Sequence, residues 1–220
     1  MAASQQFSTP EWKMTAHEKH FVYEPSEDTF ILMDALECDW ASIAVIKSPI
    51  VVEIGCGSGV ISAFIGKLFG NRGLVIGTDI NPCAIDVTSR TASLNSTSVQ
   101  VVQTDCGNSL QFRLKDSVDI LLCNPPYVPT ASAEVNSSMI ASAWAGGNQG
   151  TYLTHRVMLL AAWVLSNHGC LYLVAVDDNN PNQLLQYGST VGLHGKIVLQ
   201  RRAGLEKLFV LKLCKQKRLL

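Results

Sequence analysis

The stretch Ile50-Val51-Val52-Glu53-Ile54-Gly55-Cys56-Gly57-Ser58-Gly59-Val60 decides the fold class. Its β-branched first half predicts a buried strand over residues 50–54, and the apolar run from Val60 to Leu68 predicts a helix that ends near Gly70. Three glycines form the turn between them, so the backbone can approach a ligand closely and the next helix presents free N–H groups to it. A tight connection between strand and helix, with no ligand, is the alternative interpretation of this turn.

Short apolar runs and helical stretches alternate on both sides of the turn. A helix is predicted to follow Ser26, which suits the N-cap position. Further strands are predicted at residues 74–79, 99–103, 118–123 and 171–176, and further helices at residues 82–94 and 152–165. Two last strand-like runs, at residues 196–200 and 207–214, are separated by too few residues for a parallel crossover and must pair antiparallel. The sequence therefore predicts an α/β fold with a mostly parallel sheet, helices on both faces and a C-terminal antiparallel hairpin.

Length and composition favour one domain and exclude several classes of protein. The chain has 220 residues, 47% of them hydrophobic and 16% charged, and its net charge of −1 encodes no global attraction to nucleic acid or to an anionic membrane. The longest apolar run, residues 157–165, is too short to span a membrane. Seven cysteines without a C-x-x-C pair argue against a disulfide scaffold or a zinc site, so we expect a reduced, intracellular protein. Residues 1–22 are polar and predict an N-terminal arm, and residues 23–220 predict the domain.

Two carboxylates flank the glycine turn and suggest what binds there. Asp79 ends the second strand, where its side chain can accept both hydroxyls of a ribose. Glu53 directly precedes the turn, where it would repel a pyrophosphate but attract a cation such as a sulfonium or an ammonium group. A dinucleotide fingerprint is disfavoured, because it requires G-x-G-x-x-G and residue 60 is a valine.

The most specific segment is Asn124-Pro125-Pro126-Tyr127, directly after the strand at residues 118–123. Two consecutive prolines cannot extend a central strand, so they force a rigid turn at the edge of the sheet where ligands bind. Such a turn suits methyl transfer to a planar nitrogen, which is a poor nucleophile because its lone pair is delocalised. The Asn124 side-chain oxygen and the Pro125 carbonyl can each accept one N–H and orient that nitrogen, while Tyr127 excludes water. A proline-stiffened loop capped by asparagine is the alternative.

The E-x-G-x-G-x-G pattern with Asp79 at the next strand end resembles the class I S-adenosylmethionine-dependent methyltransferases over roughly residues 50–215. The N-P-P-Y tetrad resembles the motif shared by N5-glutamine and N6-adenine methyltransferases. The resemblance implies a three-layer α/β/α Rossmann-like fold with a seven-stranded sheet, S-adenosylmethionine as cofactor and S-adenosylhomocysteine as product. It assigns catalysis to Asn124, with Pro125, Pro126 and Tyr127 shaping the slot, and substrate binding to Asn124, Pro125 and Tyr127. It also implies cofactor contacts at Glu53, Gly55, Gly57, Asp79, Asp105, Cys106 and Asn124, although Asp105 also suits a turn or a helix cap.

Two flanking segments are similar to signatures of the HemK family, which methylates the glutamine of the Gly-Gly-Gln loop in translation release factors. They are Tyr23-Glu24-Pro25-Ser26-Glu27-Asp28-Thr29-Phe30 and Ala143-Trp144-Ala145-Gly146-Gly147. The resemblance implies that Thr29 approaches the cofactor and that the segment containing His20 closes over it. The first segment is similar to the eukaryotic branch, whose catalytic subunit pairs with a small zinc-binding activator protein. We therefore expect this protein in the cytoplasm and also in the nucleus.

One departure and three alternatives accompany this resemblance. The bacterial branch has an N-terminal helical domain that this chain lacks, so substrate recognition must depend on a partner or on residues 130–150. The resembled fold places the strand at residues 99–103 at an edge, where we expect the activator to dock. An N6-adenine DNA or RNA methyltransferase, a histone lysine methyltransferase and an inert nucleotide-binding scaffold are the alternatives. The basic residues that would serve a nucleic acid concentrate at Arg201, Arg202 and residues 215–218.

Overall fold

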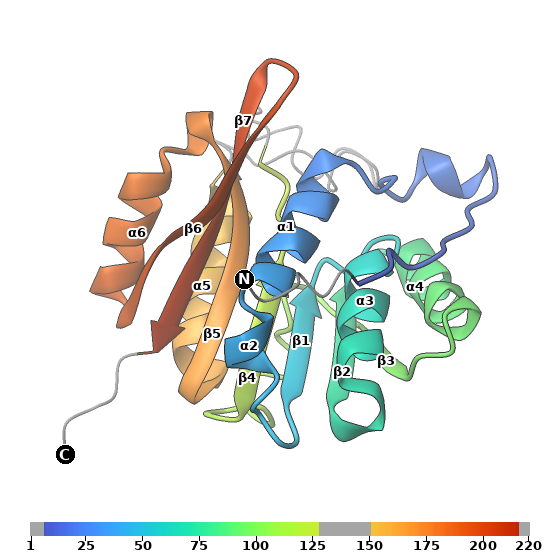
Figure 1. Cartoon of the computed structure of the whole chain (residues 1–220), viewed down its shortest axis with the longest axis horizontal. Coiled ribbons are helices and arrows are strands. Elements are labelled where there is room, and N and C mark those ends of the chain that lie inside the picture. The colour runs from blue at the N-terminus through green and yellow to red at the C-terminus, as the bar shows by residue number, and fades with distance from the viewer. Residues whose placement is uncertain (1–6, 128–150, 216–220) are drawn as a thin grey trace, which may run out of the picture.

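The computed structural model describes residues 7–127 and 151–215. Seven strands form one sheet in the order β3-β2-β1-β4-β5-β7-β6 (Figure 1). The strands are β1 (Ile50–Ile54), β2 (Leu74–Asp79), β3 (Val99–Gln103), β4 (Val118–Cys123), β5 (Leu165–Val176), β6 (Leu193–Ala203) and β7 (Glu206–Lys215). The first five are parallel, and β7 runs antiparallel to both β5 and β6. The predicted α/β fold with its C-terminal antiparallel hairpin is confirmed, and so is the edge position of β3.

Helices cover both faces of this sheet. They are α1 (Glu27–Cys38), α2 (Trp40–Ile43), α3 (Val60–Phe69), α4 (Pro82–Leu94), α5 (Tyr152–Val164) and α6 (Pro181–Thr190). Apolar side chains of α1 and α3 pack on one face of the central strands, and those of α5 and α6 pack on the other. Along β4 the side chains alternate between the two clusters, with Ile120 and Leu122 in one and Leu121 and Cys123 in the other. This burial on both faces explains why β4 is mostly apolar.

The sequence interpretation did not assign α6. Its segment is polar, but Asn180 caps it by accepting the Gln183 N–H at 3.3 Å and Pro181 occupies its first turn. Leu184 is buried against the sheet. The pair Asn180-Pro181 was the available signal for this helix.

The described part of the N-terminal arm, residues 7–22, runs along the outside of the domain (Figure 1, dark blue). Phe7 packs edge to face against Trp40 and Phe64, with ring centroids 5.6 and 6.3 Å away. Further along, Glu18 forms an ion pair with Arg90 of α4 at 2.7 Å. These contacts hold the arm against α3 and α4.

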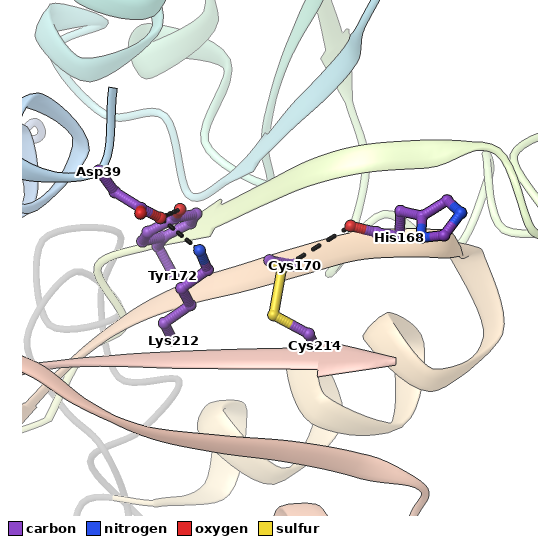
Figure 2. The surroundings of a disulfide bond; sticks show 6 residues. All are labelled: Asp39, His168, Cys170, Tyr172, Lys212 and Cys214. Carbon is purple, nitrogen blue, oxygen red and sulfur yellow. Dashed lines mark hydrogen bonds and ion pairs between the residues drawn. A yellow bond between two sulfur atoms is a disulfide. The ribbon is translucent and has the colours of Figure 1, made fainter. Parts of the chain in front are cut away.

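The expectation of a chain without disulfides is wrong at one pair of cysteines. Cys170 and Cys214 form a disulfide between β5 and β7, where they lie directly opposite each other in the strand register (Figure 2). Spacing along the chain could not reveal this pair, because only the antiparallel register brings the two residues together. Beside the disulfide, the Asp39 carboxylate accepts hydrogen bonds from the Tyr172 hydroxyl and the Lys212 ammonium group. The other five cysteines are free.

Candidate active site

A cavity of about 370 Å³ opens at the edge of the sheet where β1, β2 and β4 end. Its lining comes from the arm, the start of α1, the turns after the first four strands, and the β6–β7 hairpin. This volume lies in the usual range for small-molecule sites. The cavity brings together every predicted site residue except one: Thr29, Glu53, Gly55, Gly57, Asp79, Asp105, Cys106, Asn124, Pro125, Pro126 and Tyr127.

His20 is the exception. It ends the short 3-10 helix Glu18–His20, in which no residue is buried, and it does not line the cavity. Phe21, Val22 and Tyr23 line it instead. The arm segment predicted to close over the cofactor therefore lines the cavity, whereas the His20 side chain does not, and a cofactor contact of this segment stays a prediction. The second predicted signature, residues 143–147, and the segment at 130–150 lie outside the described residues.

The glycines of the turn have two different structural roles, since two line the cavity and the third allows two helices to pack closely. Gly55 and Gly57 adopt left-handed backbone conformations, with φ of +74° and +49°, and both line the cavity. The turn is held by the Gly55 and Cys56 N–H groups, which donate to the Thr78 carbonyl at 2.8 and 2.9 Å. Gly59 does not line the cavity. A Cβ at Gly59 would lie 2.6 Å from the Cα of Thr88, so this glycine serves the packing of α3 against α4.

Two acidic side chains lie behind the turn. Glu53 is only 2% exposed and accepts a hydrogen bond from the Ser62 hydroxyl. Burial raises the pKa of Glu53 to about 8, and the nearby charge of Asp79 acts in the same direction. Burial also raises the pKa of Asp79, although its carboxylate accepts the N–H groups of Gly57 and Asn81 at 3.0 and 2.9 Å.

Asp105 and Cys106 follow β3. The Asp105 carboxylate forms a bidentate ion pair with Arg156 of α5, with N–O distances of 2.9 and 2.8 Å. Sequence reasoning missed Arg156, because nothing in the sequence pairs residues so far apart. The Cys106 thiol is buried, which raises its pKa to about 11. It is therefore a protonated, small apolar group and not a reactive thiolate.

Asn124 lines the cavity, and its side chain carries a buried acceptor. Its Oδ1 atom is buried and has no hydrogen-bond partner among the residues that the structure describes. A buried carbonyl oxygen without a partner is rare, because the desolvation penalty is about 1–3 kcal/mol. Asn124 directly follows β4, and Pro125 and Pro126 line the cavity beside it. The oxygen is therefore an unused acceptor on a residue that lines the cavity.

Tyr127 is held from two sides. Its hydroxyl donates to the Asp28 carboxylate at 2.9 Å, and its carbonyl accepts the side-chain N–H of Asn179 at 3.1 Å. Burial and the Asp28 charge raise the pKa of the Tyr127 phenol well above its usual value, so it stays protonated. Thr29 follows Asp28, and its hydroxyl accepts the Ser26 N–H at 3.3 Å in the first turn of α1.

Five carboxyl groups and no basic side chains line the cavity in the described residues. The carboxyl groups belong to Asp28, Glu53, Asp79, Asp105 and Glu206. A cavity with this lining favours cationic ligands and disfavours phosphates. In residues 7–127 and 151–215, no group of three or more His, Cys, Asp or Glu side chains is placed to hold a metal ion. None of the helices in the same ranges is long and apolar enough to cross a membrane.

Comparison with known proteins identifies relatives along most of the chain. The methyltransferase small domain family matches residues 27–190. Methyltransferase HEMK2 of Mus musculus is 47% identical over 194 residues, which cover 88% of this chain and 90% of the relative. The eRF1 methyltransferase catalytic subunit mtq2 of Schizosaccharomyces pombe is 37% identical over 206 residues, covering 87% of this chain and 88% of the relative.

A solved structure of a related methyltransferase complex contains a chain with the same fold. A chain of the E. cuniculi Mtq2-Trm112 complex, described as responsible for the methylation of the eRF1 translation termination factor, superimposes with a TM-score of 0.66. The two chains are 27% identical, and the match covers 89% of this chain and 99% of that one.

Proposed function

This chain belongs to the HemK branch of the methyltransferase small-domain family, and from that membership we propose that it methylates a translation release factor. It is an S-adenosylmethionine-dependent methyltransferase. The acceptor in this proposal is the side-chain amide nitrogen (N5) of the glutamine in the Gly-Gly-Gln motif. The S. pombe relative, an eRF1 methyltransferase catalytic subunit, supports this acceptor.

The observation that carries the proposal is the unpartnered Asn124 oxygen. A glutamine side-chain amide has two N–H donors, and Asn124 Oδ1 is a buried acceptor that nothing in the described chain occupies. The Pro125 carbonyl is the second proposed acceptor, one residue along the same rigid turn. Two acceptors in a fixed turn orient the nitrogen before reaction, so the proposed step does not depend on a strong base.

The cavity has the side chains that a bound S-adenosylmethionine requires. A Cβ at Gly55 would meet nothing within 4 Å, so the turn leaves open space for a ligand. In this proposal Asp79 binds the ribose hydroxyls, Asp105 and the Cys106 backbone bind the adenine, and Gly55, Gly57 and Thr29 lie against the rest of the cofactor. Glu53 faces its cationic end. The cofactor supplies an electrophilic methyl group on a positively charged sulfur.

The proposed reaction is a direct displacement at the methyl carbon. The lone pair of the amide nitrogen forms the new N–C bond, while the electrons of the breaking C–S bond remain on sulfur. Sulfur becomes neutral in S-adenosylhomocysteine, and the amide nitrogen releases one proton to water. Asn124 favours this step because its oxygen binds the N–H group more strongly as the nitrogen becomes positive.

The alternative acceptors, a nucleic acid and a histone lysine, differ in how their charge suits the acidic lining of the cavity. A DNA or RNA acceptor would bring phosphates toward a cavity that carries five carboxyl groups and no basic side chain in the described lining. A histone lysine matches that charge better, but its ammonium group must lose a proton before attack, whereas an amide nitrogen carries no charge to lose. The amide acceptor needs neither a phosphate site nor a base.

The partner we propose is a small zinc-binding activator protein docked at strand β3. The structural neighbour is an Mtq2 chain in complex with Trm112, which supports a partner of this kind. Strand β3 is an edge strand with Gln100 and Gln103 exposed, and no lysine or proline in it discourages pairing. We propose the cytoplasm as the site of release-factor methylation, and the nucleus as a second compartment if a histone is an acceptor.

A transfer assay with radiolabelled S-adenosylmethionine tests the proposal. The full chain, with and without the activator protein, is offered a release-factor domain with its Gly-Gly-Gln loop, duplex DNA, RNA or a histone tail. We expect label on the release factor alone, located on the glutamine. Asn124→Ala should bind the cofactor normally and lose at least about 100-fold in transfer rate, whereas the exposed control Asn108→Ala should behave like wild type. Full activity of Asn124→Ala, or label only on another acceptor, would contradict the proposal.

A further inference from the structure

Asp28 is a buried carboxylate that the reaction described above does not use. Its place in the first turn of α1 suits the positive end of the helix dipole. A residue with only that role is normally exposed to solvent. Asp28 is instead 4% exposed and lines the cavity.

The Asp28 carboxylate joins three segments that line the site. It accepts the Thr29 N–H of α1 at 2.7 Å and the Tyr127 hydroxyl of the turn after β4 at 2.9 Å. The Tyr23 hydroxyl, from the end of the arm, lies at the outer limit of a hydrogen bond, 3.5 Å away. Tyr23, Thr29 and Tyr127 all line the cavity. Asp28 thus connects the segment before α1 to the proposed catalytic turn.

The hydrogen bond from the Tyr127 hydroxyl to the Asp28 carboxylate is a strong one. In the part of the chain that the structure describes, no lysine, arginine or histidine forms an ion pair with Asp28, so O–H and N–H donors alone compensate its burial. Because the Tyr127 phenol stays protonated beside this carboxylate, its hydroxyl is the donor in a charge-assisted hydrogen bond. Loss of that donor would leave one oxygen of the buried Asp28 carboxylate without this hydrogen bond.

The position of Tyr127 also fixes the residues before it. The Asn179 side chain donates to the Tyr127 carbonyl and accepts the Val176 N–H at 3.0 Å, which ties the backbone of the turn to the end of β5. The Asp28 carboxylate holds the side-chain hydroxyl of Tyr127. Since Pro125 and Pro126 are rigid, an error in the position of Tyr127 is transmitted along the turn to Asn124.

We propose that Asp28 is a positioning residue for methyl transfer, acting through Tyr127 to hold the acceptor slot of Asn124 in its reactive geometry. This inference rests on the proposed function and adds to it a residue that touches neither reacting atom. It also gives the first turn of α1 a purpose beyond packing, because it fixes the catalytic turn across the cavity.

A double-mutant cycle tests the proposal with Asp28→Asn, Tyr127→Phe and the double variant, in the full chain with its activator protein. We express kcat relative to the concentration of protein that binds the cofactor. We expect each single variant to lower this kcat about tenfold, and the double variant to lower it no further than either single variant. The KM for the release factor should change less than kcat, because orientation and not binding is lost. Asp34→Asn is the matched control, since Asp34 lies on the same helix but pairs with Arg201 outside the cavity.

The outcomes separate this inference from the proposed function. If wild type methylates no release factor, the proposed function fails and the inference fails with it. If wild type is active and Tyr127→Phe keeps full kcat, the inference alone is overturned, even if Asp28→Asn does not fold. Additive losses in the double variant, or a lower melting temperature with unchanged kcat per binding site, would also overturn it, because they indicate a purely structural role.

Discussion

Glu53 keeps its proton to a much higher pH than an exposed glutamate does. Its folded pKa of about 8 lies above the ordinary value of 4.5, because the side chain is buried. The folded state therefore binds this proton more tightly than the unfolded state. The stability that the protonated form contributes is complete below pH 4.5 and is lost as the pH rises toward 8.

Glu53→Gln should remove this dependence on pH. We expect wild type to lose stability relative to Glu53→Gln between pH 5 and pH 8, by up to about 1.4 kcal/mol per pH unit, and the difference to level off above the folded pKa. Urea unfolding of both proteins at several pH values, without cofactor, measures it. Parallel curves for the two proteins would show that Glu53 titrates normally.

Single residues also show where sequence reasoning stops. The positions of Asn124, Asp79 and Gly55 at the cavity could be predicted because they depend on the ends of strands, which the sequence pattern reveals. Arg156 could not, because its partner Asp105 is 51 residues away and only the fold brings them together. Asp28 lies in a segment similar to a family signature, but its bond to Tyr127 spans 99 residues, which no sequence pattern reveals.

Helix packing at the glycine turn gives a prediction at the scale of elements. Gly55 and Gly59 have nearly the same φ, +74° and +77°, but a Cβ would be free at the first and would collide with Thr88 of α4 at the second. Gly59→Ala should therefore lower the free energy of unfolding by about 2–4 kcal/mol, since α3 and α4 must separate. Gly55→Ala should lower it by only about 1 kcal/mol but should weaken cofactor binding. Denaturant unfolding and a cofactor titration compare the two, and equal losses of stability would refute the collision.

The two edges of the sheet allow a matched test of the proposed docking strand. Gln100 of β3 and Gln200 of β6 are both exposed residues on edge strands at opposite ends of the sheet. Gln100→Lys should weaken activator binding about tenfold, because a partner strand would have to bury an ammonium group. Gln200→Lys should leave binding unchanged. Calorimetry with the purified activator measures both, and equal affinities would place the interface elsewhere.

Elements were predicted best where one local pattern decides them. The strands β1 to β4 match the predicted residues because each is a short run rich in β-branched and apolar residues, although only β1, β2 and β4 are largely buried. Strand β5 begins at Leu165, earlier than predicted, because residues 166–168 are polar and give no strand pattern in the sequence. Leu165 pairs with Val118 of β4, and the pairing continues at Cys170 after a register shift. The disulfide between Cys170 and Cys214 follows from the register of β5 and β7, which no local pattern encodes.

At the scale of the whole molecule, the arm closes the cavity from outside the sheet. Phe21 and Val22 line the cavity, and the Phe21 carbonyl accepts the Asn81 side-chain N–H at 2.7 Å. The arm residues before them bury aromatic rings far from the site, at Phe7 against Trp40 and Phe64. The position of the cavity wall therefore depends on packing at the other end of the arm.

The double variant Phe7→Ala/Trp12→Ala should release the arm without changing any residue of the cavity. Trp12 packs near Phe30 of α1, with ring centroids 6.4 Å apart, so the variant removes both aromatic anchors. We expect the free energy of unfolding to fall by about 2–4 kcal/mol and the cofactor dissociation constant to rise about tenfold, because Phe21 and Val22 must then be ordered on binding. The control Phe112→Ala removes a ring that is 78% exposed and should change neither quantity. Reduced stability with unchanged cofactor affinity would mean that the arm braces the domain but does not shape the site.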